Sequence, residues 1–268
     1  MKIAFFIFSL IINLLLINPI AVDAQPAGQV SNRSYQYEKP VDGVLRVLTY
    51  NVRNCLGMDG KTDYNRVSSV IRSIQPTIVA LQELDSVTTR SSGIDVLKVL
   101  ADNCGMNYIY GASIPFRGGK YGIGILSSEK PIKSSFLPLP GKEEKRGLLI
   151  AEFKDYVLFC THFSLTEADR VASVELINQK AKEYKKHVIF AGDLNTKPES
   201  GAISTLTSSW TNLSGTNPTF PSNGPKECID YIFSLNCCGL NYNIIKQMVV
   251  PEAVASDHCP VFVDIKLK

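Results

Sequence analysis

Histidine is scarce in this sequence: the 268 residues contain three, His162, His187 and His258. Several familiar site patterns are absent as well, because the chain has no CxxC or HExxH motif of a zinc site and no GxSxG motif of a serine nucleophile. It also lacks internal repeats and low-complexity tracts, which argues against a solenoid, a propeller or a disordered chain. The surroundings of the few histidines therefore carry much of the functional information.

An excess of one charge is also missing. The formal net charge of +3 comes from 28 basic and 25 acidic residues, so the composition does not indicate a polyanion-binding protein. With 45% hydrophobic residues, the chain is long enough to bury a large core in one domain or in two.

One long apolar run is present, at the start of the sequence. Lys2 precedes an almost wholly apolar stretch from Ile3 to Ile17, and small residues follow at 22–24. Residues 1–24 are therefore predicted to be a cleaved signal peptide, which makes the mature protein secreted or periplasmic. The alternative is a membrane anchor, but the apolar stretch is shorter than the ~20 residues that span a bilayer.

The sequence contains seven cysteines, whose disulfide pairing it does not define. Export permits disulfides, and an odd number leaves at least one cysteine free or paired between chains. Cys160 lies inside the apolar run YVLFC and Cys259 lies beside VFVDI, so both are predicted to be buried.

Apolar runs separated by turn residues predict a single domain over residues 43–268, after a loose polar lead-in at 25–42. Helical spacing predicts helices after Asp63, around 96–100, after Thr166 with a capping box, and over 200–209. Strands are predicted at 44–50, 77–82, 107–110, 122–127, 148–153, 156–161, 187–191, 229–233, 244–250 and 260–267. Strands outnumber helices about two to one, and some are joined too closely for a helical crossover, so we expect an α/β (α+β) fold of mixed sheets with helices outside.

Polar side chains follow the apolar runs, where the predicted strands end. They are Asn51, Glu83, His162, Asp193, Asn195, Asp230, Asp257 and His258. Such groups cost free energy when buried unless they are paired or bind something, and strand ends on a rigid sheet position a site well. We interpret them as one site, and His187, at a helix-to-strand junction, as structural or solvated.

The residue types indicate metal-assisted hydrolysis. Asn51, Glu83 and Asp257 offer a few hard oxygen ligands, which suit Mg²⁺ or Mn²⁺. A histidine whose second nitrogen is held by a carboxylate can act as a general base at neutral pH. Because no serine or cysteine lies in a nucleophile context, water is the expected nucleophile, attacking phosphorus in line with the leaving oxygen.

Seven segments, in order along the chain, resemble the endonuclease/exonuclease/phosphatase superfamily, which has the deoxyribonuclease I-like fold. They are TYN (49–51), LQELD (81–85), YGIGILSS (121–128), CTHF (160–163), AGDLNTKP (191–198), CIDYIF (228–233) and SDHCPV (256–261). The resemblance implies a four-layer α/β sandwich of two packed mixed β-sheets flanked by helices, and divalent-metal-dependent cleavage of a phosphoester. It makes Glu83 the counterpart of the principal metal ligand, with Asn51 close by and Asp257 as a further metal- or water-orienting group.

The resemblance also implies catalytic roles. His258 resembles the general base, with Asp230 as its orienting carboxylate. Asp193 and Asn195 resemble the pair that positions the water and the scissile phosphate. His162 resembles a second histidine that stabilises phosphoryl charge or assists the leaving group, and it places the chain closer to the deoxyribonuclease, sphingomyelinase and phosphatase branches than to the abasic-site endonucleases.

The sequence departs from the family pattern in two places. Ile123 in YGIGILS stands where common relatives carry an asparagine that contacts substrate, so that role is not carried over. A glutamate that partners the first histidine in deoxyribonuclease I has no evident match, which leaves His162 without a recognisable carboxylate partner.

Specificity is expected from the loops between strands, at 53–63, 113–121, 138–147 and 213–227. Arg117, Lys120 and Arg146 are candidates for binding substrate phosphate; the alternative is ordinary solvated loop charge.

Four functions fit these observations to different degrees. The first is a secreted phosphoesterase that acts on a small or lipid-derived phosphodiester or monoester, and the second is a secreted nuclease. A sphingomyelinase would need an exposed aromatic hairpin, for which residues 136–139 are the one candidate unless they form a sheet edge. A catalytically inactive binding module is the fourth. No stable protein partner is implied, and a monomer is the default.

Overall fold

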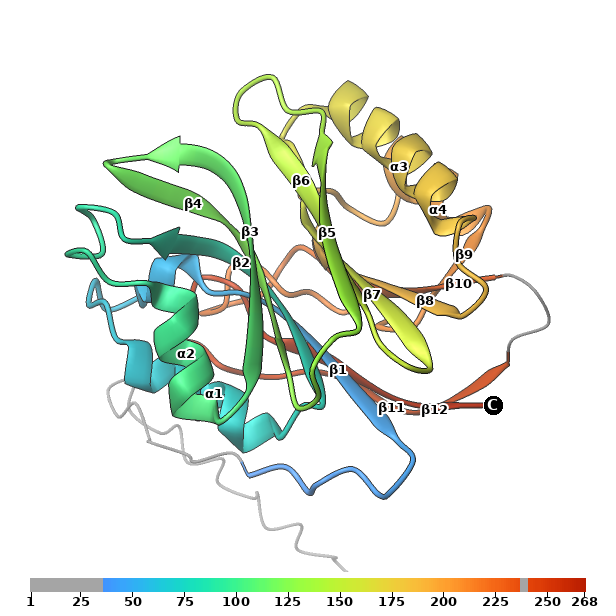
Figure 1. Cartoon of the computed structure of the whole chain (residues 1–268), viewed down its shortest axis with the longest axis horizontal. Coiled ribbons are helices and arrows are strands. Elements are labelled where there is room, and N and C mark those ends of the chain that lie inside the picture. Colours follow the sequence, from blue (N-terminus) through green and yellow to red (C-terminus); the bar gives the residue numbers. More distant parts are fainter. Residues whose placement is uncertain (1–35, 237–240) are drawn as a thin grey trace, which may run out of the picture. The chain divides into compact units, whose positions relative to one another are not determined.

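Two six-stranded β-sheets form the centre of the fold (Figure 1). The structure, a computed structural model, describes residues 36–236 and 241–268. The predicted signal peptide, most of the lead-in and the pair Cys237-Cys238 lie outside the described residues. All described residues belong to one compact unit.

The first sheet has the strand order β11-β12-β1-β2-β4-β3. Its strands are β1 (Leu45–Asn51), β2 (Ile78–Ser86), β3 (Asn107–Phe116), β4 (Gly119–Ser127), β11 (Tyr242–Val249) and β12 (Val261–Leu267). The second sheet has the order β5-β6-β7-β8-β10-β9. Its strands are β5 (Lys133–Leu139), β6 (Arg146–Glu152), β7 (Tyr156–His162), β8 (His187–Asp193), β9 (Trp210–Asn212) and β10 (Asp230–Leu235). Each sheet contains one parallel pair, β1–β2 or β7–β8, among antiparallel neighbours, so both sheets are mixed as predicted.

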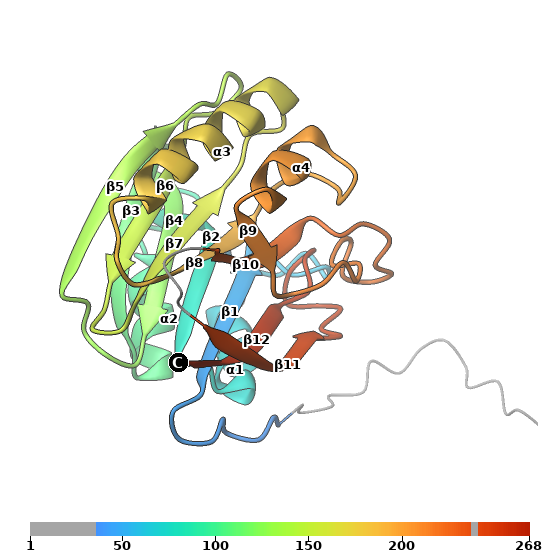
Figure 2. The same cartoon turned by 90° about the vertical axis from the view of Figure 1, so that its right-hand side faces the viewer.

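Helices cover the outer faces of the sheets (Figures 1 and 2). They are α1 (Tyr64–Ile74) and α2 (Val96–Cys104) on the first sheet, and α3 (Glu167–Ala181) and α4 (Gly201–Thr207) on the second; a single 3-10 turn, η1 (Arg53–Cys55), follows β1. The predicted four-layer α/β sandwich is thus confirmed. No helix in the part of the chain that the structure describes is long and apolar enough to cross a membrane.

Three apolar clusters hold these layers together. One lies between the sheets and contains Val47, Ile125, Leu158 and Ile232. The other two lie between each sheet and its helices. The central cluster makes the two sheets one rigid support, which matters because the strands of both sheets deliver side chains to one site.

Two helix starts test the sequence predictions. Asp63 caps α1, and its side chain accepts a hydrogen bond from the backbone of Arg66 (2.9 Å). The capping box predicted at Thr166 is wrong, because the Thr166 hydroxyl makes no cap bond and instead donates to Oε2 of Glu143 (3.3 Å). A carboxylate from the β5–β6 loop has replaced the helix amide as its partner.

Edge strands are where the sequence predictions fall short. β5 and β9 were not expected, and the predicted loop 113–121 is the tip of the long β3–β4 hairpin. Edge strands are half exposed and carry residues such as Pro115 and Pro138, which weaken the apolar pattern. The Phe136 ring lies so close over Gly147 that a Cβ there would come within 2.0 Å of it. Residues 136–139 therefore belong to a sheet edge and do not form an exposed aromatic hairpin.

Cys160 and Cys259 are buried, as predicted. With Cys55, Cys104 and Cys228 they make five free thiols among the described residues.

Candidate active site

Strand register places three of the predicted site residues in one row of the second sheet. His162, the last residue of β7, pairs with Asp193, the last residue of β8, and Asp193 pairs with Asp230, the first residue of β10. In register, neighbouring side chains point to the same face of a sheet. Gly192 permits this close approach, since a Cβ there would lie 2.2 Å from the carbonyl oxygen of Thr161.

A β-bulge turns Glu83 toward this row from the first sheet. Between the pairs Leu81–Gly124 and Leu84–Gly122, two residues of β2, Gln82 and Glu83, oppose the single residue Ile123. Glu83 has a left-handed backbone (φ +60°), as have the site residues Arg53 (+46°) and Asn195 (+47°). Such conformations are costly for non-glycine residues and often mark functional sites. Ile123 itself is buried in the core between the sheets and offers no polar group.

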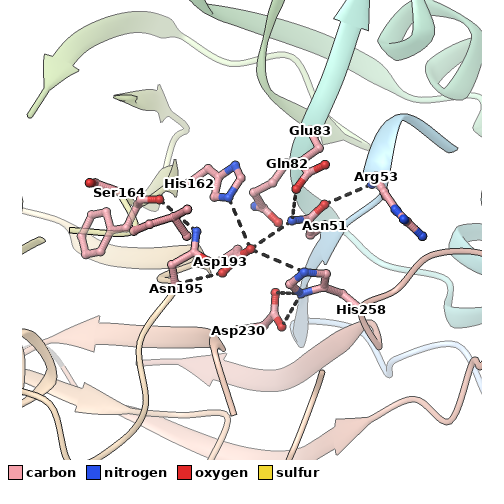
Figure 3. A network of polar contacts seen from close by, with 12 residues as sticks. Asn51, Arg53, Gln82, Glu83, His162, Ser164, Asp193, Asn195, Asp230 and His258 are labelled. Atoms are coloured by element: carbon pink, nitrogen blue, oxygen red, sulfur yellow. Dashed lines mark hydrogen bonds and ion pairs between the residues drawn. The ribbon is translucent and has the colours of Figure 1, made fainter. Parts of the chain in front are cut away.

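Asn51 connects the two sheets at the site (Figure 3). Its Nδ2 donates to Oε1 of Glu83 on the first sheet and to Oδ2 of Asp193 on the second, each at 3.0 Å. Its Oδ1 accepts from the backbone of Arg53 (3.0 Å), which orients the amide. One side chain therefore sets the spacing of two carboxylates.

His258, in the loop before β12, lies between two carboxylates. Its Nδ1 is 2.9 Å from Oδ2 of Asp230, and its Nε2 is 3.7 Å from Oδ2 of Asp193. Thr219 completes the arrangement by donating its hydroxyl to Oδ2 of Asp230 (2.5 Å). Burial alone would lower the pKa of His258, but the charges of Asp230 and Asp193, the hydrogen bond to Asp230 and the charge of Asp257 outweigh it and raise the pKa to about 10.

His162 approaches Asp193 from the opposite side (Figure 3). Its Nε2 lies 3.4 Å from Oδ2 of Asp193, and its Nδ1 lies 3.3 Å from Nη1 of Arg146. Burial lowers the pKa of His162 to about 4, and the positive charge of Arg146 acts in the same direction against the opposing charge of Asp193. The group next to Nδ1 of His162 is thus an arginine, whereas the group next to Nδ1 of His258 is a carboxylate.

Asn195 fixes the other oxygen of Asp193. The backbone N–H of Asn195 donates to Oδ1 of Asp193 (2.9 Å), and its side-chain Nδ2 donates to the carbonyl of Phe163 (3.0 Å). Asp193 is buried and both its oxygens are engaged, so its carboxylate has one defined orientation.

The donor set suits a divalent cation. Burial raises the pKa of Glu83, against its hydrogen bond from Asn51, and the charges of Asp193 and Asp257 raise it further, so the carboxylates repel one another. Within residues 36–236 and 241–268, neither Glu83 nor Asp193 forms an ion pair with a lysine or arginine. Asp193, Asp230 and His258 also offer possible metal-ligating atoms within 4.8 Å of one another. Asp230 and His258, however, are hydrogen-bonded to each other. Excess negative charge on hard oxygen donors fits Mg²⁺ or Mn²⁺.

Asp257 sits at the edge of this group. Its carboxylate lies 3.3 Å from Nε of Arg53, so its charge is already partly neutralised. It contributes negative charge near Glu83 and His258. Its geometry favours an outer position rather than the centre of a metal site.

The three cationic candidates lie in different places. Arg117 and Lys120 are exposed on the β3–β4 hairpin, and Arg117 stacks on the ring of Phe116 (5.3 Å). Neither makes a contact with the residues of the row. Arg146 is 7% exposed and reaches the site, where it contacts His162 and pairs with Glu144 (2.9 Å).

Several supporting residues were not identified from the sequence. Ser256 precedes Asp257-His258, and its hydroxyl donates to the carbonyl of Asn51 (2.7 Å), which ties the His258 loop to β1. Arg53, two residues after Asn51, had a sequence signal in its proximity to the TYN segment. Thr219 had none, because it lies 11 residues from Asp230 in an irregular loop.

His187 lies at the start of β8, at the opposite end of the strand from Asp193. It is buried and lies 3.4 Å from the carbonyl of Lys268. A hollow of about 570 Å³ opens there, lined by His187, Lys154, Lys185 and Lys186 among others. The interpretation of His187 as structural agrees with this position, which is separate from the residues described above.

Comparisons with known proteins agree with the geometry. The family model described as "Endonuclease/Exonuclease/phosphatase family" matches residues 48–258. A family protein from Bacteroides vulgatus is 23% identical (TM-score 0.68; 84% of this chain and 99% of that chain covered). A mannosyl-6-phosphatase from Bacteroides thetaiotaomicron is 19% identical (0.66; 82% and 99%). The human Nocturnin catalytic domain with bound sulfate is 18% identical (0.66; 84% and 95%).

No curated protein matches the chain. The structural neighbours are too distant in sequence to show more than the shared fold, whereas the family model spans most of the chain. This chain therefore belongs to the endonuclease/exonuclease/phosphatase family, whose members are hydrolases acting on phosphoester bonds.

Proposed function

We propose that the protein is a secreted, divalent-metal-dependent phosphoesterase that hydrolyses a phosphodiester or phosphomonoester with an activated water. The observation that carries the proposal is the position of His258, with Asp230 behind its Nδ1 and Asp193 in front of its Nε2. This is the arrangement of a general base whose orientation is set by one carboxylate and whose working nitrogen faces the reaction.

The residues divide the reaction among them. A water held by Asp193 loses a proton to Nε2 of His258 while its oxygen forms the new bond to phosphorus and the bond to the leaving oxygen breaks. The leaving oxygen takes up a proton from solvent. The second amide proton of Asn195, not used by Phe163, is available to a phosphoryl oxygen. Asp193 and His258 thus act on the water, and Asn195 acts on the phosphoryl group. No covalent intermediate with the protein is formed.

Asn51 and Glu83 are the residues that would hold the divalent cation, with Asp257 outside them. When bound, the cation would polarise a phosphoryl oxygen and offset the negative charge that raises the pKa of His258.

Two further features support the proposal in general terms. The family includes a mannosyl-6-phosphatase among the structural neighbours, and the Nocturnin domain was solved with a sulfate, an anion of phosphate-like shape.

The proposal that the protein is secreted rests on the predicted signal peptide at residues 1–24 alone. A single substrate phosphoester is the one partner proposed, and a monomer is the simplest assembly.

The test is a panel assay on the purified mature chain. It compares a phosphomonoester, a bis-aryl phosphodiester, sphingomyelin and plasmid DNA, each with Mg²⁺, with Mn²⁺ and with a chelator. Turnover of at least one substrate that the chelator abolishes is the expected result. Failure on this and a wider phosphoester panel, with a folded protein, would favour an inactive binding module instead.

A nuclease is the second candidate, and the β3–β4 hairpin favours it. Arg90, which pairs with Asp85 (2.7 Å), lies over the rings of Phe116 (4.7 Å) and Tyr121 (5.5 Å), and Tyr121 pairs with β2 next to the bulge that carries Glu83. Basic and aromatic side chains therefore lie close to the site. Aromatic and arginine side chains of this kind stack on bases. A nuclease would lose affinity steeply with salt, by about one log unit per log unit of salt for each phosphate contacted. A small-substrate phosphatase would show little change.

A further inference from the structure

We propose that Arg146 is a positioning residue that holds His162 as the neutral Nε2–H tautomer, so that His162 donates a hydrogen bond in the reaction while His258, held in the opposite tautomer, accepts the proton. The catalytic role of His162 rests on the proposed function. The tautomer of His162 follows from the contacts of its ring and does not depend on that function.

The tautomer of His162 follows from what its two neighbours are able to do. A guanidinium has donors and no acceptor, so Nη1 of Arg146, 3.3 Å away, requires a lone pair on Nδ1 of His162. An ionised carboxylate only accepts, so Oδ2 of Asp193, 3.4 Å away, favours a proton on Nε2. Both neighbours therefore select the same form.

The contacts of His258 place a proton on Nδ1. The carboxylate of Asp230, 2.9 Å from Nδ1, requires the proton there. While His258 is charged, the proton on its Nε2 faces Asp193. Once that proton is lost, the lone pair left on Nε2 is the one that accepts a proton from the water in the proposed reaction. Both imidazoles thus point their Nε2 atoms at one oxygen of Asp193 (Figure 3). Arg146 behind His162 keeps the proton off its Nδ1, whereas Asp230 behind His258 keeps the proton on its Nδ1, so only His258 can lose its Nε2 proton and then accept another.

Arg146 is itself fixed in this orientation. Its Nη1 pairs with Glu144 (2.9 Å) and its Nη2 with Glu143 (3.5 Å), and the side chain is almost fully buried. Glu143 also accepts from Ser164 (2.9 Å) and from the backbone of Leu165 (2.8 Å), which joins the β5–β6 loop to the segment after His162. Two glutamates offset the charge of Arg146, which makes it less suited to binding a substrate phosphate than its sequence position indicated.

This arrangement has a chemical consequence. A histidine backed by a carboxylate can become charged and act as an acid, whereas one backed by an arginine is held neutral. The low pKa of His162 agrees with this. His162 therefore keeps its proton throughout and stabilises the developing phosphoryl charge as a hydrogen-bond donor.

The direct test is a long-range ¹H–¹⁵N correlation spectrum of the full mature chain at neutral pH, with excess Mg²⁺ and with a chelator. The three histidines give three ring patterns, and His187→Gln and His258→Gln assign them by elimination. We expect the Nε2–H pattern for His162 in both conditions. For His258 we expect the doubly protonated pattern in chelator and the Nδ1–H pattern where Mg²⁺ offsets the surrounding negative charge. A Nδ1–H or doubly protonated His162 would overturn the proposal whether or not any substrate is turned over.

Variants then separate positioning from binding. Arg146→Met removes the donor and is expected to mix the tautomers of His162 and to lower kcat about 10- to 100-fold with KM within a few-fold. Arg146→Lys keeps a donor and should restore the single tautomer and much of kcat; it also serves if the methionine variant fails to fold. Arg72→Met, at an exposed arginine on α1, is the matched control. A raised KM with kcat and the tautomer unchanged would make Arg146 a substrate-binding residue and would refute the inference.

Discussion

Nδ1 of His258 lies 2.9 Å from Oδ2 of Asp230, although the two residues are 28 positions apart. His258 lies in the loop before β12 of the first sheet, and Asp230 is the first residue of β10 in the second sheet. The contact is buried, and the Thr219 hydroxyl donates to the same oxygen of Asp230. It engages Nδ1 of His258 and leaves Nε2 to accept the proton of the attacking water. The first prediction follows from this division.

Removing either member of this pair is expected to disable the reaction. His258→Ala should lower kcat by about 10²–10⁴-fold, because the base is lost. Asp230→Asn should cost a similar factor, since an amide donor would place the proton of His258 on Nε2. The double variant should be no worse than the worse single one, because the two residues act as a unit. Steady-state kinetics on folded variants checks this; additive losses would mean that the residues act independently.

Glu83→Gln should weaken metal binding while stabilising the metal-free protein. The raised pKa of Glu83 shows that its buried charge is unfavourable without a cation, so a neutral amide relieves repulsion. We expect a melting temperature a few degrees higher in chelator, about 2–4 °C per kcal/mol for a domain of this size. The further rise that Mn²⁺ produces in wild type should be lost.

The matched control is Glu199→Gln, at an exposed glutamate. It should change neither the melting temperature in chelator nor the response to Mn²⁺. Retention of full Mn²⁺ stabilisation by Glu83→Gln would remove Glu83 from the metal site.

The charge of His258 should make metal-free stability depend on pH. Its folded pKa of about 10 lies above the unfolded value of about 6.5, so the folded state binds the proton more tightly. The stabilisation is complete below the unfolded pKa and is lost as the pH rises through 10. Urea unfolding in chelator should therefore show a gap between wild type and His258→Gln that is larger at pH 6 than at pH 10. A gap independent of pH would show that His258 is not charged in the folded state.

A buried ion pair away from the site should matter for stability. Arg46 makes two contacts with Asp264 (2.6 and 2.7 Å), donates to the carbonyl of Ile74 and lies over the ring of Phe262 (4.6 Å). Arg46→Met leaves Asp264 buried and unpaired, which should cost about 3–5 kcal/mol in the free energy of unfolding.

Urea denaturation provides the comparison. Arg66→Met breaks the partly exposed pair with Asp59 and should lower the free energy of unfolding far less than Arg46→Met does. Adding Asp264→Leu to Arg46→Met should recover part of the loss, since the unpaired charge is gone. Equal effects of the two arginine variants would contradict the burial argument.

Much of the fold was predictable because its signals are local. The N-cap of Asp63, the helical spacing after it and the apolar runs of the central strands depend on residues near one another in sequence, and each was found where predicted. The half-exposed strand β5 was missed because its pattern is diluted by the solvent face and by Pro138. The predicted capping box at Thr166 was wrong, because the Thr166 hydroxyl donates to Glu143, a residue distant in sequence, and makes no hydrogen bond to the helix backbone.

By itself, the sequence determined the family, the layered fold and the set of polar residues that end the strands, since chain order and residue type are enough to identify them. Only the tertiary structure decided which of these polar residues contact one another. The bulge that turns Glu83, the amide of Asn51 between the sheets, and the neighbours of His162 and His258 all depend on strand register and on loops that meet across the fold. An imidazole can donate or accept from either nitrogen, and the charge that stands behind it, which is set by packing, chooses between these roles.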